Sequence, residues 1–305
     1  MEKNKYRLKG HESFIIRDGW ITNGLYAVHD NPKVFSSTAA ADALGVGTNM
    51  AKSIRYWLKT AGLMKENSMQ GAHLTDIGEL IFQNDPYMED IFTTWLIHIN
   101  VAVNYEQATT WNVYFNNLDM YRFQRDELLP AIMPLMLDAT KMDKLPERSL
   151  KDDCTAILSM YSSAEKSDDP EEKRESPFAD LGLLSRKGNY FERTRPDLST
   201  IDPLLIMYFI AGCFEEDQTQ GKKSVSIDDL DEKPNMPGRI LQLNRIMVND
   251  YLDALHNKGL IVVNRTAGLD MVYEQEKLTR KDVVEAYYQG VTDDSVGTRQ
   301  NRSQV

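Results

Sequence analysis

The sequence predicts a mainly α-helical protein of the α+β class, with small β-hairpins. Apolar residues recur at three- and four-residue spacing over long stretches, which indicates helices that bury one face. Two short β-rich runs, 63–75 and 260–273, have polar, glycine-containing centres and indicate hairpins. At 305 residues, with 42% hydrophobic and 9% aromatic content, the chain is long enough for two domains with real cores.

The stretch 38–64 predicts two short helices separated by a tight turn. The first helix is alanine-rich and ends at Leu44, because the glycines of Gly45-Val46-Gly47 accept backbone angles that stop a helix. Thr48 or Asn49 is expected to cap the second helix. The second helix has an apolar stripe at helical spacing, formed by Met50 or Ala51, Ile54, Trp57 and Leu58.

The opposite face of this second helix is polar and basic. It carries Asn49, Lys52, Ser53, Arg55, Tyr56 and Lys59. Side chains of these types reach base edges and phosphates from a helix in the major groove. Because a hairpin with a polar tip is predicted next, residues 1–83 are expected to form a winged helix-turn-helix that binds double-stranded DNA. The alternative is an ordinary helical hairpin whose Lys and Arg side chains are only solvated.

Charge is distributed unevenly along the chain. The formal net charge of −11 argues against a general nucleic-acid binder, yet residues 1–65 hold ten Lys or Arg against five Asp or Glu. The remaining residues hold 25 Lys or Arg against 41 Asp or Glu. A basic N-terminal module on an acidic body is expected to bind DNA locally through few phosphates, and therefore weakly and with strong salt dependence.

Three residues near the N-terminus are the candidates for catalysis. His11 and Glu12 belong to a Gly-His-Glu turn, and Arg17 follows a few residues later. His11 and Glu12 suit the role of a base or a metal ligand, and Arg17 suits that of a phosphate clamp. The structural alternative is that His11 and Glu12 hydrogen-bond a neighbouring helix and that Arg17 pairs with Glu12. The first helix of the module is expected over 20–28 and ends near Asp30.

The middle segment, 84–163, is expected to be a helical connector. Thr75 and Asp90 each precede an apolar run and are expected to cap a helix. Four residues here have the side-chain types of metal ligands: Asp85, Glu89, Asp90 and His98. However, aspartate before proline is common in turns, and aspartate at a helix start is usually a cap. No metal site is therefore predicted. The aromatic residues of this segment are expected in a core or an inter-domain seam: Trp111, Tyr114, Phe115 and Tyr121.

The segment 164–290 is expected to be a C-terminal domain with a winged-helix-like fold. A charged loop over 164–175 leads to a small strand pair, and Asp202-Pro203 opens an apolar helix over 204–213. A helix over 244–258 and a hairpin over 260–273 complete the domain. Since that helix exposes several acidic side chains, a protein-facing or structural role is expected for it. The polar residues 291–305 are expected to be a disordered tail.

Cysteine usage and hydropathy indicate a cytoplasmic protein. Cys154 and Cys213 lie in apolar helical surroundings and lack metal-ligand spacing, so buried free thiols in a reducing compartment are expected. The longest apolar run, 203–214, is too short to span a bilayer. The N-terminus lacks the apolar core of a signal peptide, so no membrane association is expected.

Several motifs spread along the chain form one set. They are Gly10-His11-Glu12-Ser13-Phe14 with Arg17 and Gly19-Trp20, the helix-turn-helix block over 44–57, the block over 74–78, Asp85-Pro86-Tyr87-Met88-Glu89-Asp90 with 94–98, and Ser176-Pro177-Phe178. Together they resemble the domain-of-unknown-function family 4007. The resemblance covers nearly the whole chain, and the helix-turn-helix block is its most specific part.

The resemblance implies a component of a bacterial DNA phosphorothioate-modification system with an anti-phage role. Such a protein is taken to nick one DNA strand so that sulfur can enter the backbone, with a cysteine desulfurase and an ATP-using sulfur-transfer protein as partners. A divalent metal, Mg or Mn, is the cofactor expected of a nickase. The sequence itself shows no nuclease motif, which favours the alternative of a non-catalytic winged-helix DNA-binding adaptor or transcriptional regulator. A pure protein scaffold is the third interpretation, and it requires the basic helix to be buried.

Overall fold

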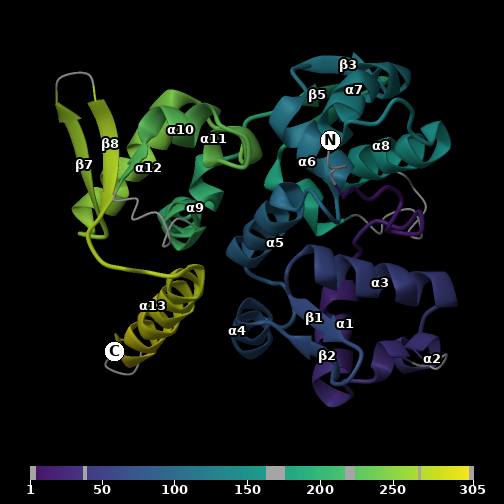
Figure 1. The fold of residues 1–305 in the computed structure, drawn as a ribbon. Coiled ribbons are helices and arrows are strands. Elements are labelled where there is room, and N and C mark those ends of the chain that lie inside the picture. The colour runs from purple at the N-terminus through teal and green to yellow at the C-terminus, as the bar shows by residue number, and fades with distance from the viewer. Residues whose placement is uncertain (1–4, 37–39, 163–175, 217–223, 267–268, 302–305) are drawn as a thin grey trace. The chain divides into compact units, whose positions relative to one another are not determined.

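The computed structural model describes residues 5–36, 40–162, 176–216, 224–266 and 269–301 of the chain. They form helices and small antiparallel sheets (Figure 1), which confirms the α+β prediction. The chain divides into two compact units: unit 1 holds Met1–Ile201 with Lys233–Leu243, and unit 2 holds Asp202–Glu232 with Asn244–Val305. Within the described ranges, every helix is too short or too polar to cross a bilayer.

The N-terminal part of unit 1 consists of helices followed by a hairpin. Its elements are α1 (Trp20–Asp30), α2 (Ala40–Leu44), α3 (Thr48–Thr60), β1 (Met64–Asn67) and β2 (Gly71–Leu74). The chain leaves α2 through Gly45, whose φ is +64°. Gly47 is the N-cap residue of α3 and no side chain caps it, so the expected Thr48 or Asn49 cap is wrong: the extended backbone of Gly47 already turns the chain into the helix.

The buried stripe of α3 follows the predicted spacing. Ala51, Ile54, Trp57 and Leu58 are all buried. Leu58 and Ile54 pack so closely against α1 that a Cβ on Gly24 would lie 2.7 Å from Leu58 and 3.0 Å from Ile54. The α1–α3 contact therefore depends on a residue without a side chain at position 24.

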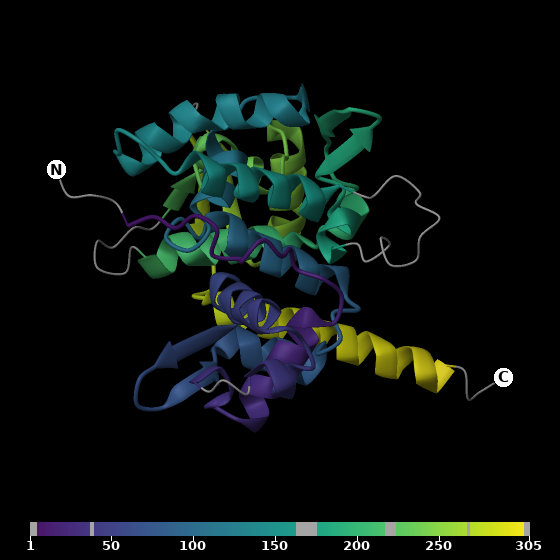
Figure 2. The same ribbon diagram turned by 90° about the vertical axis from the view of Figure 1, so that its right-hand side faces the viewer.

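The remainder of unit 1 is mostly helical. Its helices are α4 (Asp76–Asn84), α5 (Ile91–Val103), α6 (Thr109–Asn117), α7 (Arg125–Thr140), α8 (Glu147–Tyr161) and α11 (Pro237–Ile240). The side chains of Thr75 and Asp90 accept hydrogen bonds from the first turns of α4 and α5, which confirms both predicted caps. Figures 1 and 2 show α7 and α8 side by side, and the two helices are in contact.

The core of unit 1 is rich in aromatic side chains. Trp111, Tyr114 and Phe115 are each about 1% exposed, as expected for core residues, whereas Tyr121 is 71% exposed. Trp57 of α3 meets Trp111 of α6 edge to face, with ring centroids 5.4 Å apart. Because this contact joins residues from both sides of position 83, the segments 1–83 and 84–163 share one core.

A three-stranded antiparallel sheet covers one side of α7 and α8. Its strands are β3 (Arg122–Gln124), β5 (Tyr190–Arg193) and β4 (Leu184–Lys187), in that order. The pair β4–β5 was expected after 176–184. Strand β3 was not expected, because it joins the sheet through only three residues: Phe123, which lies opposite Phe191, and one residue on each side of Phe123. The charged loop predicted over 164–175 lies outside the described residues.

Unit 2 combines helices with a second three-stranded antiparallel sheet. Its elements are α9 (Pro203–Glu216), β6 (Ser224–Ser226), α10 (Ile227–Glu232), α12 (Arg245–Asn257), β7 (Ile261–Thr266), β8 (Leu269–Glu274) and α13 (Arg280–Asn301), with strand order β6–β8–β7. The backbone N–H of Leu204 donates to Asp202, which is the predicted helix start. Helix α13 continues to Asn301, so helix occupies most of the segment 291–305 that was expected to be disordered, and 302–305 lie outside the described residues.

Candidate nucleic-acid interface

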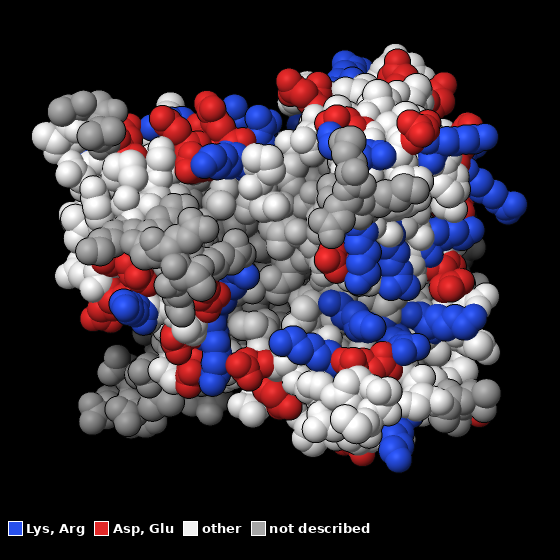
Figure 3. Space-filling model, in the orientation of Figure 1, with Lys and Arg blue, Asp and Glu red and all other residues white. Residues whose placement is uncertain are grey.

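Four of the predicted DNA contacts form a solvent-facing row along α3: Asn49, Lys52, Arg55 and Lys59. The first two residues of this row, Asn49 and Lys52, are exposed. They lie one turn apart, and the Lys52 ammonium donates to the Asn49 amide oxygen over 3.3 Å. Lys52 makes no ion pair with a described carboxylate. Figure 3 shows Lys and Arg side chains gathered over the area that α3 occupies in Figure 1. The start of α3 therefore presents an uncompensated cation to solvent beside an amide.

Further along the same row, Arg55 and Lys59 converge on Glu66 of β1. The Arg55 guanidinium donates to one Glu66 carboxylate oxygen from Nε at 3.0 Å and from Nη2 at 2.6 Å, and Lys59 Nζ lies 3.7 Å from that oxygen. The Glu66 side chain is 11% exposed, while those of Arg55 and Lys59 are 42% and 37% exposed. Both cations still face solvent, and Glu66, which the sequence placed in a polar hairpin tip, offsets one of the two charges.

Two of the six predicted DNA contacts, Ser53 and Tyr56, are buried instead, which corrects their assignment to the exposed face. The Ser53 hydroxyl donates to the carbonyl of Phe14 over 3.3 Å, and the Tyr56 hydroxyl donates to the carbonyl of Gln107 over 2.8 Å. Burial raises the pKa of Tyr56 above its ordinary value, so its phenol stays a neutral donor. The N-terminal segment packs along a second side of α3, and this widens the buried face beyond the apolar stripe.

The three catalytic candidates do not form one reactive cluster. His11 is fully buried, with Nε2 2.9 Å from Asp153 of α8 and its ring stacked on Trp57. Glu12 is exposed, and the Arg17 guanidinium lies over aromatic rings of its own segment. A fully buried imidazole does not reach a DNA phosphate. His11 instead hydrogen-bonds a neighbouring helix, α8, as the structural alternative expected.

The acidic residues around the start of α5 serve the backbone. Asp85 accepts hydrogen bonds from the N–H groups of Glu89 and Asp90 at 2.9 and 3.1 Å. His98 is buried and bonded to Tyr161 and to the carbonyl of Ile240. Across the described part of the chain, no three His, Cys, Asp or Glu side chains are grouped so that they hold a metal ion. These residues therefore do not fit a preformed divalent-metal cage.

Comparison with known proteins gives a family and two similar folds. The family model described as "Protein of unknown function (DUF4007)" matches residues 8–288. Two solved structures of SspB, one of them bound to magnesium ion, each match with a TM-score of 0.80 and cover 93% of this chain and 88% of theirs, at 22% identity for the magnesium-bound structure and 23% for the other. No curated protein matches the chain. At these identities the likeness to SspB establishes a shared fold.

Proposed function

Because this chain belongs to the DUF4007 family, we propose that it is the DNA-binding component of a bacterial DNA phosphorothioate-modification and anti-phage system. The shared fold with SspB supports this proposal, since the family resemblance implies that same system. A cysteine desulfurase and an ATP-using sulfur-transfer protein are its proposed partners. The structural observation that carries the DNA-binding part is the solvent-facing row of Asn49, Lys52, Arg55 and Lys59 on α3.

In this proposal α1, α2, α3 and the β1–β2 hairpin act as a winged helix-turn-helix. Helix α3 enters the major groove, where Lys52 contacts phosphate and Asn49 is placed to read a base edge. Arg55 and Lys59 approach the backbone from the far end of the row. The exposure of this row opposes the scaffold interpretation, which required the basic helix to be buried.

We further propose that the protein nicks one DNA strand, so that sulfur can enter the opened backbone. Hydrolysis adds water at phosphorus and breaks one P–O bond, and it needs positive charge opposite the developing negative charge. Magnesium is bound in one SspB structure. In this chain the described residues do not form a cage for such an ion. No catalytic step is therefore assigned to a metal or to His11.

The second candidate function is a non-catalytic DNA-binding adaptor or transcriptional regulator. One observation favours it: His11, the candidate base, is buried in the core of unit 1. Both functions use the same α3 row, so they make the same prediction for DNA binding. They differ only in whether the bound DNA is cut.

Replacing Lys52 with glutamine is expected to weaken binding to every duplex sequence and to lower the slope of log affinity against log salt by about 1. Asn49→Ala is expected to cost about 1–3 kcal/mol at one base position and little elsewhere. Fluorescence anisotropy of a labelled duplex at two salt concentrations measures both effects. Lys144→Gln is the matched control, because Lys144 is an exposed lysine in the loop between α7 and α8. Equal affinities for wild type, Lys52→Gln and Lys144→Gln would exclude α3 as the DNA contact.

The same samples decide between the two candidate functions. Supercoiled plasmid is incubated with wild-type protein, with and without Mg²⁺ or Mn²⁺, and scored for the open circular form. Relaxation that depends on divalent metal supports the nickase. Intact, salt-dependent DNA binding without any relaxation supports the adaptor.

Neutralising Glu66 is expected to strengthen DNA binding. In Glu66→Gln the amide no longer offsets the charges of Arg55 and Lys59, so the row gains one net positive charge close to the phosphates. Affinity is expected to rise severalfold at low salt and to converge with wild type at high salt. Glu79→Gln on α4 removes an equal charge elsewhere in unit 1 and controls for net charge alone. A Glu66→Gln variant with unchanged or weaker binding at low salt would contradict the proposed role of Arg55 and Lys59.

A further inference from the structure

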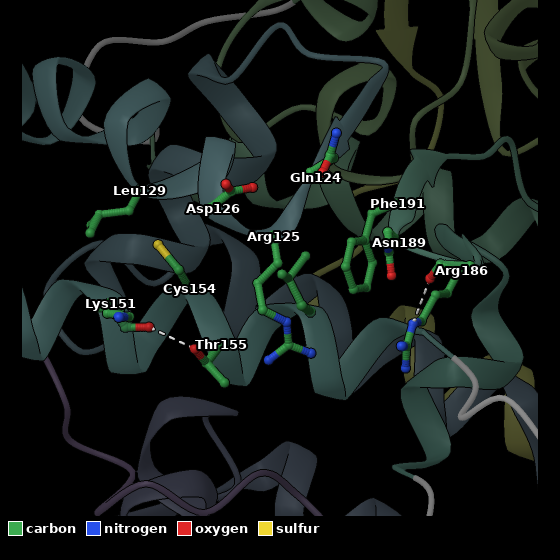
Figure 4. Close-up of a pocket in the computed structure, with 12 residues that line it drawn as sticks. Gln124, Arg125, Asp126, Leu129, Lys151, Cys154, Thr155, Arg186, Asn189 and Phe191 are labelled. Carbon is green, nitrogen blue, oxygen red and sulfur yellow. Dashed lines mark hydrogen bonds between the residues drawn. The ribbon is translucent and has the colours of Figure 1, made fainter. Parts of the chain in front are cut away.

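A pocket separate from the α3 row opens between the start of α7, helix α8 and the β4–β5 hairpin (Figure 4). Its volume is about 450 Å³, which lies within the usual range of small-molecule sites. It is lined by Gln124, Arg125, Asp126, Leu129, Lys151, Cys154, Thr155, Leu158, Arg186, Gly188, Asn189 and Phe191. All of these residues belong to unit 1.

Three cations surround this pocket, and one acidic side chain accompanies them. Arg125, Lys151 and Arg186 come from three different elements, and none of the three forms an ion pair with a described carboxylate. Arg186 donates from Nε to the carbonyl of Gly188 at 3.2 Å, which leaves its terminal N–H groups available. Asp126 supplies the single negative charge, so the pocket carries a net positive charge.

The two arginines lie near one aromatic ring. The guanidinium carbons of Arg125 and Arg186 each lie 5.9 Å from the centroid of the buried Phe191 ring. Figure 4 shows both guanidinium groups extending toward the same side of the pocket. At this distance each guanidinium makes a cation–π contact with Phe191, which leaves N–H donors free for a phosphate.

The floor of the pocket is apolar and uncharged. Leu129, Leu158 and Phe191 contribute hydrocarbon, and Cys154 contributes a thiol. Burial, together with the neighbouring Asp153 carboxylate, raises the pKa of Cys154 to about 12, so the thiol stays protonated at neutral pH. A cationic rim above an apolar floor suits a ligand that has both an anionic group and a flat, weakly polar body.

We propose that this pocket binds a nucleoside phosphate, with the phosphate held by Arg125, Lys151 and Arg186 and the nucleoside lying over the apolar floor. The volume exceeds what a phosphate group alone would fill. Thr155 and Asn189 supply hydrogen-bonding groups for the sugar or base. The ligand is either a free nucleotide or a terminal nucleotide of a DNA strand, and the chemistry of recognition is the same for both. This proposal does not depend on the α3 row.

Isothermal titration calorimetry of the full chain tests the proposal with deoxyadenosine 5′-monophosphate, deoxyadenosine and inorganic phosphate as separate probes. Saturable binding of the nucleotide, weaker binding of phosphate and no binding of the nucleoside are expected. In Arg125→Gln/Arg186→Gln the nucleotide affinity is expected to fall at least tenfold. Arg148→Gln is the matched control, because Arg148 is an exposed arginine on α8 outside the pocket.

A second arm identifies the source of the nucleotide. Nicked duplexes with and without a 5′-phosphate at the nick are compared on wild type and on the double variant. A preference for the 5′-phosphate that the double variant loses assigns the pocket to a DNA end, and binding of the free nucleotide alone assigns it to a small molecule. Unchanged affinity of the double variant for all of these probes overturns the proposal. Lys52→Gln, measured in parallel, reports on the α3 row separately, because it is expected to leave binding of the free nucleotide unchanged.

Discussion

Replacing Asp153 with alanine is expected to lower the free energy of unfolding of unit 1 by about 3–5 kcal/mol. The Asp153 side chain is 2% exposed and accepts three hydrogen bonds. They come from the backbone N–H of Lys9 at 2.9 Å, from His11 Nε2 at 2.9 Å and from the Thr110 hydroxyl at 2.6 Å. Alanine would leave two buried donors and the half-buried N–H of Lys9 without an acceptor, and a void between them.

The neighbouring residue Asp152 provides the control for this prediction. Asp152 forms an ion pair with Lys9 at 2.6 Å, but both side chains are about one-third exposed, so Asp152→Ala is expected to cost less than about 1 kcal/mol. Urea unfolding followed by tryptophan fluorescence compares the two variants. The prediction fails if the two alanine variants are destabilised equally.

Asp153 also connects the core to the proposed DNA-binding helix. It anchors Lys9 and His11 in the N-terminal segment, and that segment in turn accepts hydrogen bonds from Ser53 and Trp57 of α3 at the carbonyl of Phe14. In Figure 2 the N-terminal segment runs in an extended path across unit 1. The glycine of the Gly-His-Glu turn is explained by packing: a Cβ on Gly10 would lie 2.3 Å from the Tyr56 ring.

The parts of the fold that the sequence predicts correctly are those set by local periodicity. The stripe of α3 from Ala51 to Leu58 is buried because a helix brings residues three and four apart onto one face. The Thr75 and Asp90 caps are local for the same reason. Each of these features depends on atoms within a few residues of one another.

The features that the sequence does not predict depend on distant parts of the chain. Ser53 and Tyr56 are polar and lie beside the predicted stripe, and they are buried because residues 5–17 and the stretch around Gln107, both distant in sequence, pack against α3. Strand β3 pairs with β5, which lies far along the chain. The segment Lys233–Leu243 belongs to unit 1 although the residues on both sides of it belong to unit 2. No short-range pattern reports such contacts.

The candidate sites differ in the same way. Four of the six predicted DNA contacts remain at the surface because they share one helix face, which helical spacing defines. The nucleotide pocket was not predicted, since Arg125, Lys151 and Arg186 lie on three elements and have no common spacing. Glu66 was missed because a hairpin places it beside Arg55 of the preceding helix.

The segment Lys233–Leu243 is attached to unit 1 partly through His98 of α5. His98 Nε2 lies 2.9 Å from the carbonyl oxygen of Ile240, which only accepts, so Nε2 carries the proton. Nδ1 is then the acceptor for the Tyr161 hydroxyl at 2.8 Å, and burial keeps that phenol protonated by raising its pKa. The network therefore requires a neutral imidazole, in agreement with burial lowering the pKa of His98 to about 4.

Unit 1 is accordingly expected to lose stability as the pH falls from about 6.5 toward 4, by about 1.4 kcal/mol per pH unit and about 3 kcal/mol in total. The sign follows from the proton count: between these values the unfolded chain binds a proton at His98 and the folded chain does not, so acid favours unfolding. Above pH 6.5 the contribution is complete and no longer changes.

Urea unfolding of wild type, His98→Asn and His73→Asn at pH 7.0 and 4.5 isolates this contribution. His98→Asn is expected to be less stable than wild type at pH 7.0, because asparagine fills the site poorly, but to lose about 3 kcal/mol less on acidification. His73 is an exposed histidine on β2, and its variant is expected to follow wild type at both pH values. Other groups that titrate in this range affect all three proteins alike, so the difference between variants reports on His98. If His98→Asn loses as much stability as wild type, then His98 is not the group that makes unit 1 acid-sensitive, and the attachment of Lys233–Leu243 does not depend on a neutral imidazole.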